Sequence, residues 1–236
     1  MKVSVIMTEA SLQLENLTVE ERGVLALQLL QEQVVDQRQK LHYWRSITNQ
    51  PAQIDTGYVA QHLVSLVTGV AGAGMRGKGE DLADGSEVKS ANFLDALDRR
   101  GACAPRWNLM ANDVRTMENL LHRPAIYLVS LDLNGPGLFR ARLWCLYPGM
   151  HLAFRGRYVE WMEKLGKPKL EDPRRPYANF QLFPPRLKTD DSYARHGNGR
   201  DFARLQIQLE IPPTATKIFH GEEHPTGHVT LLTMAP

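Results

Sequence analysis

Apolar residues recur at helical spacing in the first third of the chain. Thr18-Val19-Glu20-Glu21 is a capping-box pattern, and the apolar positions after it repeat every three or four residues. This pattern predicts one long amphipathic helix over 18–44. A second run with the same spacing predicts a helix over 56–68. The glycine-rich stretch 69–74 then ends the periodicity, and no Gly-Lys-Ser/Thr follows it, which excludes a P-loop.

Short helices and strands are expected to alternate in the rest of the chain. Asn92 and Asn112 are candidate caps for helices over 93–100 and 113–121. The apolar run 125–131 predicts a buried strand that forms a hairpin with 138–147. A helix near Tyr158–Leu165 is expected to end at Gly166 and Pro168, and the Pro- and Arg-rich stretch 171–199 reads as a long loop. The last expected strands are 203–211 and 229–234.

The composition is that of an ordinary globular protein. Hydrophobic residues make up 43% of the 236 positions and charged residues 23%, and no stretch has the length and apolarity of a membrane span or a signal sequence. We therefore expect a cytoplasmic protein without membrane contact. Cys103 and Cys145 are too few for a disulfide framework or a four-thiolate zinc site, and we expect both to be small buried residues.

Positive charge is concentrated in the second half of the chain. Residues 1–100 carry a net charge of −3 and residues 101–236 a net charge of +5. Between Phe139 and Lys188, 11 lysines and arginines face only four acidic residues, with aromatic residues among them. Such a segment is suited to neutralising phosphates. A solvated basic surface over an ordinary aromatic core is the alternative interpretation.

The most informative segment brings carboxylates and a lysine together within nine residues. It reads Asp81-Leu82-Ala83-Asp84-Gly85-Ser86-Glu87-Val88-Lys89. On a strand, Glu87 and Lys89 share one face while Val88 points to the core. If a second carboxylate arrives from the preceding segment, the pair can hold Mg²⁺, which prefers oxygen ligands.

The turn between these segments decides whether Asp81 can be that carboxylate. A two-residue turn at Asp84-Gly85 would place Asp81 and Glu87 on opposite faces. A three-residue loop with Gly85 in the left-handed conformation, a G1 bulge, would pair Asp81 with Glu87 and put both on the face of Lys89. We predict the bulged turn and Asp81 as the first metal ligand, with Asp84 as the fallback.

Asp81 followed by Glu87-Val88-Lys89 resembles the signature of the PD-(D/E)xK nucleases, and the block 79–91 is similar to type II restriction endonucleases of that superfamily. The resemblance implies an α/β fold, with a central mixed β-sheet flanked by helices and an N-terminal helical extension. It implies that Asp81 and Glu87 bind Mg²⁺, replaceable by Mn²⁺, and that Lys89 orients or deprotonates the attacking water. Three features depart from the family pattern. The spacing of six residues from Asp81 to Glu87 is short, and Glu80 replaces the usual proline. Where many members offer an acidic residue, the helix 56–68 has only Gln61 and His62.

The resulting prediction is an endodeoxyribonuclease of a restriction-modification system that cuts double-stranded DNA at a short palindromic site. Residues 1–50 would form a helical region for dimerisation or for clamping DNA, in a homodimer. Residues 51–236 would form the nuclease domain, with basic DNA-binding loops at about 139–204. Arg, Lys, Asn and Gln side chains can recognise DNA bases directly through hydrogen bonds to the base edges. The candidate DNA-binding residues are Arg76, Lys78, Asn92, Arg106, Asn108, Asn179, Gln181, Arg186 and Lys188.

Two other functions remain open at this point. A repair or recombination nuclease of the same fold would share the catalytic residues and select DNA by its shape. A non-catalytic DNA-binding protein would use Glu87 and Lys89 only as a structural salt bridge, with no dependence on Mg²⁺.

Overall fold

A five-stranded mixed β-sheet forms the centre of the structure, a computed structural model that describes residues 13–50, 52, 54–74, 80–92, 105–135, 138–174, 177–186 and 191–235. The strand order is β1-β3-β4-β8-β9; β1 pairs parallel with β3, and the other neighbours are antiparallel. The strands are β1 (Glu87–Asn92), β3 (Ile126–Gly135), β4 (Leu138–Leu146), β8 (Ala215–Glu223) and β9 (Val229–Met234). The expected hairpin of two apolar strands is confirmed as β3 and β4, and the last expected strand as β9.

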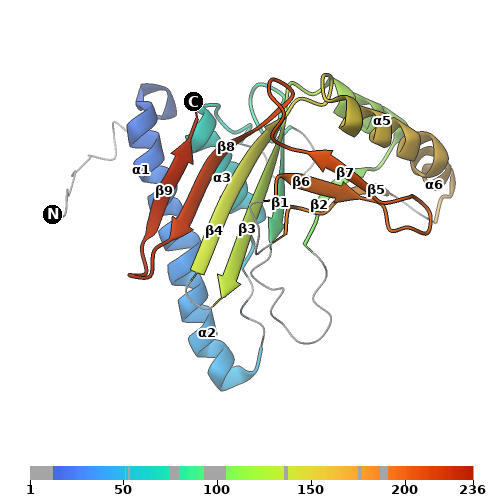
Figure 1. Cartoon of the computed structure of the whole chain (residues 1–236). Coiled ribbons are helices and arrows are strands. Elements are labelled where there is room, and N and C mark those ends of the chain that lie inside the picture. The colour runs from blue at the N-terminus through green and yellow to red at the C-terminus, as the bar shows by residue number, and fades with distance from the viewer. Residues whose placement is uncertain are drawn as a thin grey trace.

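One face of this sheet is covered by the N-terminal helices (Figure 1). A 3₁₀ turn, η2 (Leu14–Asn16), precedes α1 (Val19–Leu30), which continues through the π-helical segment η3 (Gln31–Asp36) into α2 (Gln37–Thr48). The capping box at Thr18 is present. The next helix, α3 (Gly57–Thr68), packs against α1 and β1. Its apolar side joins those of α1, η3 and the sheet in one core, so the first part of the N-terminal helical region belongs to the body of the fold.

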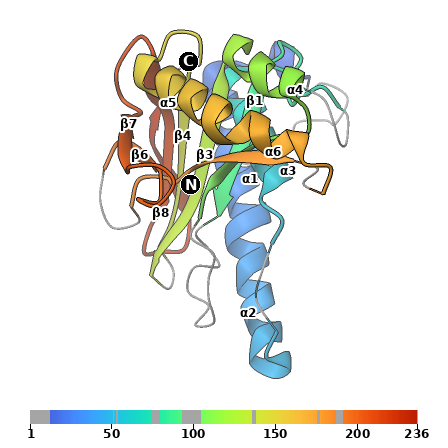
Figure 2. The same ribbon diagram turned by 90° about the vertical axis from the view of Figure 1, so that its right-hand side faces the viewer.

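The opposite face of the sheet is covered by the C-terminal helices and two small sheets (Figure 2). The helical elements are α4 (Val114–Asn119), η4 (Leu120–His122), α5 (Leu152–Trp161), the π-helical η5 (Met162–Gly166) and α6 (Lys167–Glu171). One small sheet pairs β2 (Trp107–Ala111) with β5 (Ala178–Leu182), and the other pairs β6 (Tyr193–His196) with β7 (Leu205–Gln208). The expected α/β fold, a mixed sheet flanked by helices, is therefore confirmed.

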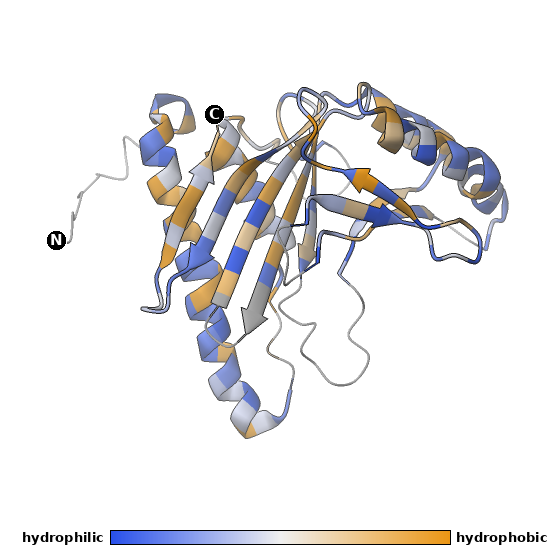
Figure 3. Cartoon of the chain, in the orientation of Figure 1, coloured by the Kyte–Doolittle hydropathy of each residue, from blue (hydrophilic) through white to orange (hydrophobic). Residues whose placement is uncertain are grey.

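Strand alternation divides the two cores. Along β3, Ile126 and Leu128 point towards α5, whereas Tyr127 and Val129 point towards α1 and α3. Along part of β4, hydrophobic and hydrophilic positions alternate (Figure 3). Among the described residues, no helix is long and apolar enough to cross a membrane.

The prediction of a long loop over 171–199 is wrong, because the described part of this segment contains β5 and β6. The alternation of buried Ala178, Phe180 and Leu182 with polar residues is a strand pattern that the surrounding prolines and arginines obscure. Two further strands, β2 and β8, lie where no strand was expected, and the strand expected over 203–211 is limited to β7. The helix expected over 93–100 lies outside the described residues.

Three helix boundaries also differ from expectation. The helix around Tyr158 does not end at Gly166: it continues as α6 with Pro168 in its first turn, where a missing N–H is tolerated. Gly166 is needed for packing, since a Cβ there would lie 2.8 Å from Met117 Sδ. Asp113, not Asn112, caps α4, and the N-terminal helix extends past Trp44 to Thr48.

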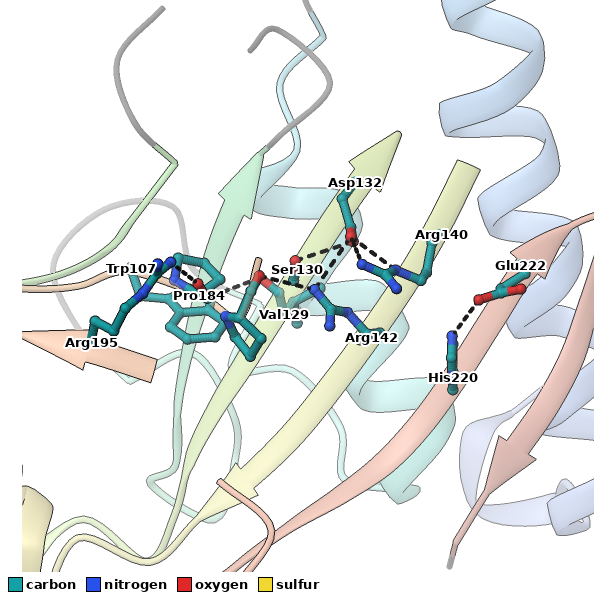
Figure 4. A network of polar contacts seen from close by, with 11 residues as sticks. Trp107, Val129, Ser130, Asp132, Arg140, Arg142, Pro184, Arg195, His220 and Glu222 are labelled. Carbon is teal, nitrogen blue, oxygen red and sulfur yellow. Dashed lines mark hydrogen bonds and ion pairs between the residues drawn. The ribbon is translucent and has the colours of Figure 1, made fainter. Parts of the chain in front are cut away.

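Charged side chains form a buried network on the α5 side of the sheet, beyond the apolar residues of β3 and β4 (Figure 4). The Asp132 carboxylate accepts hydrogen bonds from Arg140 at 2.6 and 2.9 Å and from Arg142 at 3.3 Å. Arg142 also donates to the Pro185 carbonyl, and Arg195 donates to the Pro184 carbonyl. The arginines at the start of the expected basic region are thus buried structural groups, and the region contains helices and strands as well as loops.

Replacing Asp132 with alanine should be strongly destabilising. The change leaves two buried guanidinium groups without their carboxylate, which costs about 3–5 kcal/mol of unfolding free energy. The exposed pair of Glu160 and Lys164 is the control, and Lys164→Ala should cost under about 1 kcal/mol. Urea denaturation of both variants measures the difference; similar losses would contradict a structural role for the buried network.

His196 should make stability depend on pH. Burial, assisted by nearby Arg157, lowers the pKa of His196 from 6.5 to about 4, and the ring stacks on Phe180 at a centroid distance of 4.1 Å. The unfolded chain takes up the proton near pH 6.5 and the folded protein only near pH 4, so this stability is present above pH 6.5 and is lost as the pH falls towards 4. A His196→Phe variant should therefore show a smaller fall in Tm between pH 7 and pH 4.5 than the wild type; equal falls would exclude this residue as the source.

Candidate active site

Strand β1 presents Glu87 and Lys89 on the same face of the central sheet. The strand pairs parallel with β3 in the register Glu87 with Ile126 and Lys89 with Leu128, and the Glu87 N–H donates to the Ala125 carbonyl at 3.0 Å. Glu87 and Lys89 form an ion pair in which their side chains are 15% and 23% exposed. The intervening Val88 is buried on the opposite face.

The turn before β1 has the predicted bulged geometry. The Leu82 N–H donates to the Ser86 carbonyl at 3.3 Å, and the Gly85 N–H donates to the Leu82 carbonyl at 3.0 Å. Gly85 has a φ of 86°, the left-handed conformation that glycine adopts without strain. The three-residue loop 83–85 is thus confirmed.

The longer antiparallel ladder expected beyond this turn is not formed. Asp81 lies in a bend, Leu82 bridges Gly72, and the sheet neighbour of β1 is β3. The Asp81 carboxylate is instead fixed by two hydrogen bonds: Oδ2 accepts from the Val88 N–H at 2.8 Å and Oδ1 accepts from Gln61 Nε2 at 2.7 Å. The carboxylate therefore lies beside the strand at the residue between Glu87 and Lys89.

Gln61 comes from α3, the helix in which the sequence offered no acidic residue. Because α3 packs against β1, its side chain reaches Asp81 across 20 positions of sequence. An amide can orient a carboxylate by donating a hydrogen bond, and it adds no charge. The sequence contained this residue but no signal for its partner.

The fallback residue Asp84 has a different environment. Its Oδ1 accepts from the Ser86 N–H at 2.9 Å and its Oδ2 from the Ser86 hydroxyl at 3.0 Å, so the side chain folds back on its own turn. Asp84 also lines a surface hollow of about 380 Å³, bounded by Glu80, Ala83, Asp84, Gly85, Asn119, His122, Arg123 and Pro124.

Arg123 is a neighbour of the candidate site that sequence reasoning missed. Its guanidinium lies 2.6 Å from Glu80 Oε1, donates to the Gly85 carbonyl at 3.2 Å and lies 3.9 Å from Glu87 Oε2. It precedes β3 and reaches β1 only because the two strands start side by side. Glu80, which replaces the usual proline, is thereby held in an ion pair.

The donor set suits a small hard cation. Asp81 and Glu87 supply carboxylate oxygens, the ligands that Mg²⁺ prefers, and a magnesium ion commonly keeps several waters. Within the described ranges, no group of three or more His, Cys, Asp or Glu side chains could hold a metal. The chemistry of these two carboxylates fits Mg²⁺, and their joint binding of one ion stays a prediction.

Four of the candidate DNA-binding residues are brought together on the outer side of the sheet formed by β2 and β5. Arg106, Asn108, Asn179 and Gln181 are linked by hydrogen bonds of 2.9 to 3.2 Å. Asn92 is the last residue of β1, and Arg186 is exposed. Arg76, Lys78 and Lys188 lie outside the described residues, as does Cys103. Cys145 is buried, as expected.

A Gly85→Ala substitution should test the turn that positions Asp81. An added Cβ would make only ordinary van der Waals contacts, the nearest with Pro124 Cδ at 3.8 Å, so the cost comes from the left-handed backbone. We expect a loss of about 1–2 kcal/mol of unfolding free energy. In contrast, Gly156→Ala within α5, where an added Cβ meets no neighbour, should stabilise by up to about 1 kcal/mol. Thermal denaturation distinguishes the two; a neutral Gly85→Ala would contradict the bulged turn.

Comparison with known proteins places the chain in a family. Residues 43–220 match the family model described as MamI restriction endonuclease. The chain is 32% identical over 213 residues to the type II restriction enzyme MamI of Microbacterium ammoniaphilum, a match that covers 82% of this chain and 64% of the relative. The chain thus spans a little under two thirds of the length of that curated relative. No solved structure matches. The family match extends over most of the sequence and includes the candidate site: the chain belongs to the MamI restriction endonuclease family.

Proposed function

We propose that this protein is a type II site-specific deoxyribonuclease that hydrolyses phosphodiester bonds of double-stranded DNA in a restriction-modification system. The observation that carries the proposal is the placement of Glu87 and Lys89 on one face of β1, with the Asp81 carboxylate beside the residue between them. This arrangement occurs within the part of the chain that matches a restriction endonuclease family.

Asp81 and Glu87 are the proposed ligands of Mg²⁺, and Mn²⁺ is expected to replace it. When bound, the ion would offset charge that builds up on the phosphate oxygens and lower the pKa of a coordinated water. Gln61 and the Val88 N–H fix both oxygens of Asp81, which reduces the reorganisation needed to receive a ligand. Asp84 stays the fallback ligand, because its side chain folds back on its own turn, whereas Gln61 and Val88 hold the Asp81 side chain beside β1.

Lys89 is the proposed positioning group for the attacking water. Its ammonium forms an ion pair with Glu87. A charged ammonium can orient the water and offset negative charge in the transition state, whereas a general base must first lose its proton. We therefore assign Lys89 the positioning and electrostatic role.

The N-terminal helical region and the oligomeric state are part of the same proposal. A homodimer suits a short palindromic site, because each subunit can cut one strand. Helix α2 has no acidic residue; besides the buried Arg38 it carries Lys40 and Arg45, and it exposes Tyr43 and Trp44. Such a helix can contact DNA or a second subunit, and sedimentation of the protein with and without DNA separates the two uses.

Cleavage should depend on Lys89 and on a divalent cation. Digestion of a plasmid of known sequence should give discrete fragments with Mg²⁺ or Mn²⁺ and no cleavage with EDTA. Lys89→Ala and Asp81→Asn should each lower the cleavage rate at least about 100-fold, because each removes a group that acts on the transition state or its metal. Binding of the same DNA without divalent cation should change little.

The matched control is Lys217→Ala. Lys217 lies on β8, which is separated from β1 by β3 and β4 in the sheet. Its side chain has nearly the same exposure, 22%, and forms an ion pair with Glu210 at 3.3 Å. This variant should cleave like the wild type. Branch-selective nicking without discrete fragments would favour a repair or recombination nuclease. Cleavage-free binding that is indifferent to Mg²⁺ and to Lys89 would favour a non-catalytic DNA-binding protein.

A further inference from the structure

The sheet of β2 and β5 has one apolar and one polar side. Its buried side consists of alternate residues, Trp107 and Leu109 on β2 with Phe180 and Leu182 on β5. On the other side, Asn108 faces Gln181 and Met110 faces Asn179 across the two strands. Together with the preceding arginine, these side chains form what we call the amide face: Arg106, Asn108, Met110, Asn179 and Gln181.

Hydrogen bonds arrange the polar groups of the amide face in a row. Arg106 Nη1 donates to Gln181 Oε1 at 3.0 Å, and Gln181 Nε2 donates to Asn108 Oδ1 at 3.2 Å. Asn179 Nδ2 donates to the same Asn108 oxygen at 2.9 Å. In the described part of the chain, Asn179 Oδ1 is enclosed and accepts no hydrogen bond. Three hydrogen bonds thus hold the row in one arrangement, and the enclosed Asn179 oxygen is not open to a ligand.

The chemistry of the amide face differs from that of an ordinary solvated sheet surface. It contains no acidic residue and no lysine, the residues that usually keep an exposed sheet soluble. Instead it holds amides, a guanidinium and the thioether of Met110, which is 52% exposed. Asn and Gln pair with adenine, Arg pairs with guanine, and an apolar group contacts the thymine methyl.

The shape of the element fits the same ligand. The major groove of B-form DNA admits a two-stranded β-ribbon. This ribbon is rigidly supported, because Phe180 packs edge-to-face against Tyr158 and Trp161, and Trp107 Nε1 donates to the Val129 carbonyl at 2.7 Å. Base readout requires groups held on rigid elements.

The ribbon is also attached to the face of the central sheet that carries the candidate catalytic residues. Ala91, two residues after Lys89 on the same side of β1, packs in the core that contains Trp107 and Leu109. A base contact made by the ribbon is thus transmitted to β1 through a buried apolar interface. Figure 1 shows β2 and β5 next to β1 on this side.

We propose that the amide face enters the major groove of the DNA and reads base pairs of the recognition site, with Asn108 and Gln181 as the central readers. This inference rests on the proposed function, because it assigns the specificity of the same enzyme.

Cleavage of a randomised duplex library in Mg²⁺, followed by sequencing of the cut ends, first defines the site of the wild type. Asn108→Ala and Gln181→Ala should then relax discrimination at one or two base pairs by about 10- to 100-fold and leave the other positions unchanged. Because these residues do not neutralise phosphates, the salt dependence of DNA binding should stay the same.

Duplexes with 7-deazapurines at single positions of that site give a second readout that does not depend on the folding of a variant. They lack the N7 acceptor in the major groove, so the wild type should bind and cut them more weakly at the positions read by the ribbon. At those positions the Asn108→Ala or Gln181→Ala variant should show no additional loss. Gln206→Ala, which removes an exposed glutamine from the other two-stranded sheet, is the matched control and should keep full specificity.

The outcomes separate the two proposals. If the wild type cuts no DNA, the proposed function fails. If it cuts at discrete sites but both variants keep its discrimination, or if no 7-deaza substitution affects it, the function stands and the role of the amide face is overturned.

Discussion

The parallel pairing of β1 with β3 is the constraint on which the candidate site depends. The backbone register holds β1 in place, and alternate residues of a strand point to the same face. Glu87 and Lys89 therefore share a face independently of their side-chain contacts. The free edge of β1 begins beside the bulged turn, where the N–H of Val88 is available to the Asp81 carboxylate. The same pairing brings Arg123, at the start of β3, to Glu87 and to the turn. One strand register thus assembles side chains from three separate segments.

The sequence predicted the local features of this site and few of the long-range ones. Asp84-Gly85 allowed two turns, and we predicted the bulged one because it would bring Asp81 to the face of Glu87. The bulged geometry is confirmed. The antiparallel ladder expected after it is not formed, because Asp81 takes its hydrogen bonds from Gln61 and Val88. The sequence could not predict that Gln61 contacts Asp81, because this contact depends on the packing of α3. It could not predict the place of Arg123 either, because that depends on the register of β3. That Asp81 and Glu87 bind one metal stays a prediction.

The fold shows the same division between local and long-range information. Helices α1 and α3 and the hairpin of β3 and β4 have regular apolar spacing, and all were predicted. Strands β2 and β5 pair across a separation of about seventy residues, and neither has a turn signal to announce it. Arg140 and Arg142 counted as positive surface charge in the sequence, but Asp132 on the neighbouring strand buries them in a network. Composition could therefore count these charges without locating them.

The side-chain charge of the N-terminal helix changes from negative to positive along its length. From Glu20 to Asp36 its charged residues are acidic except Arg22, whereas α2, which projects from the body in Figure 2, has only basic ones. The helix is thus an electric dipole built from side chains, with its positive end farthest from the sheet. In the field of a polyanion such a dipole experiences a torque as well as an attraction, and added salt would weaken both over distances of roughly 10 Å.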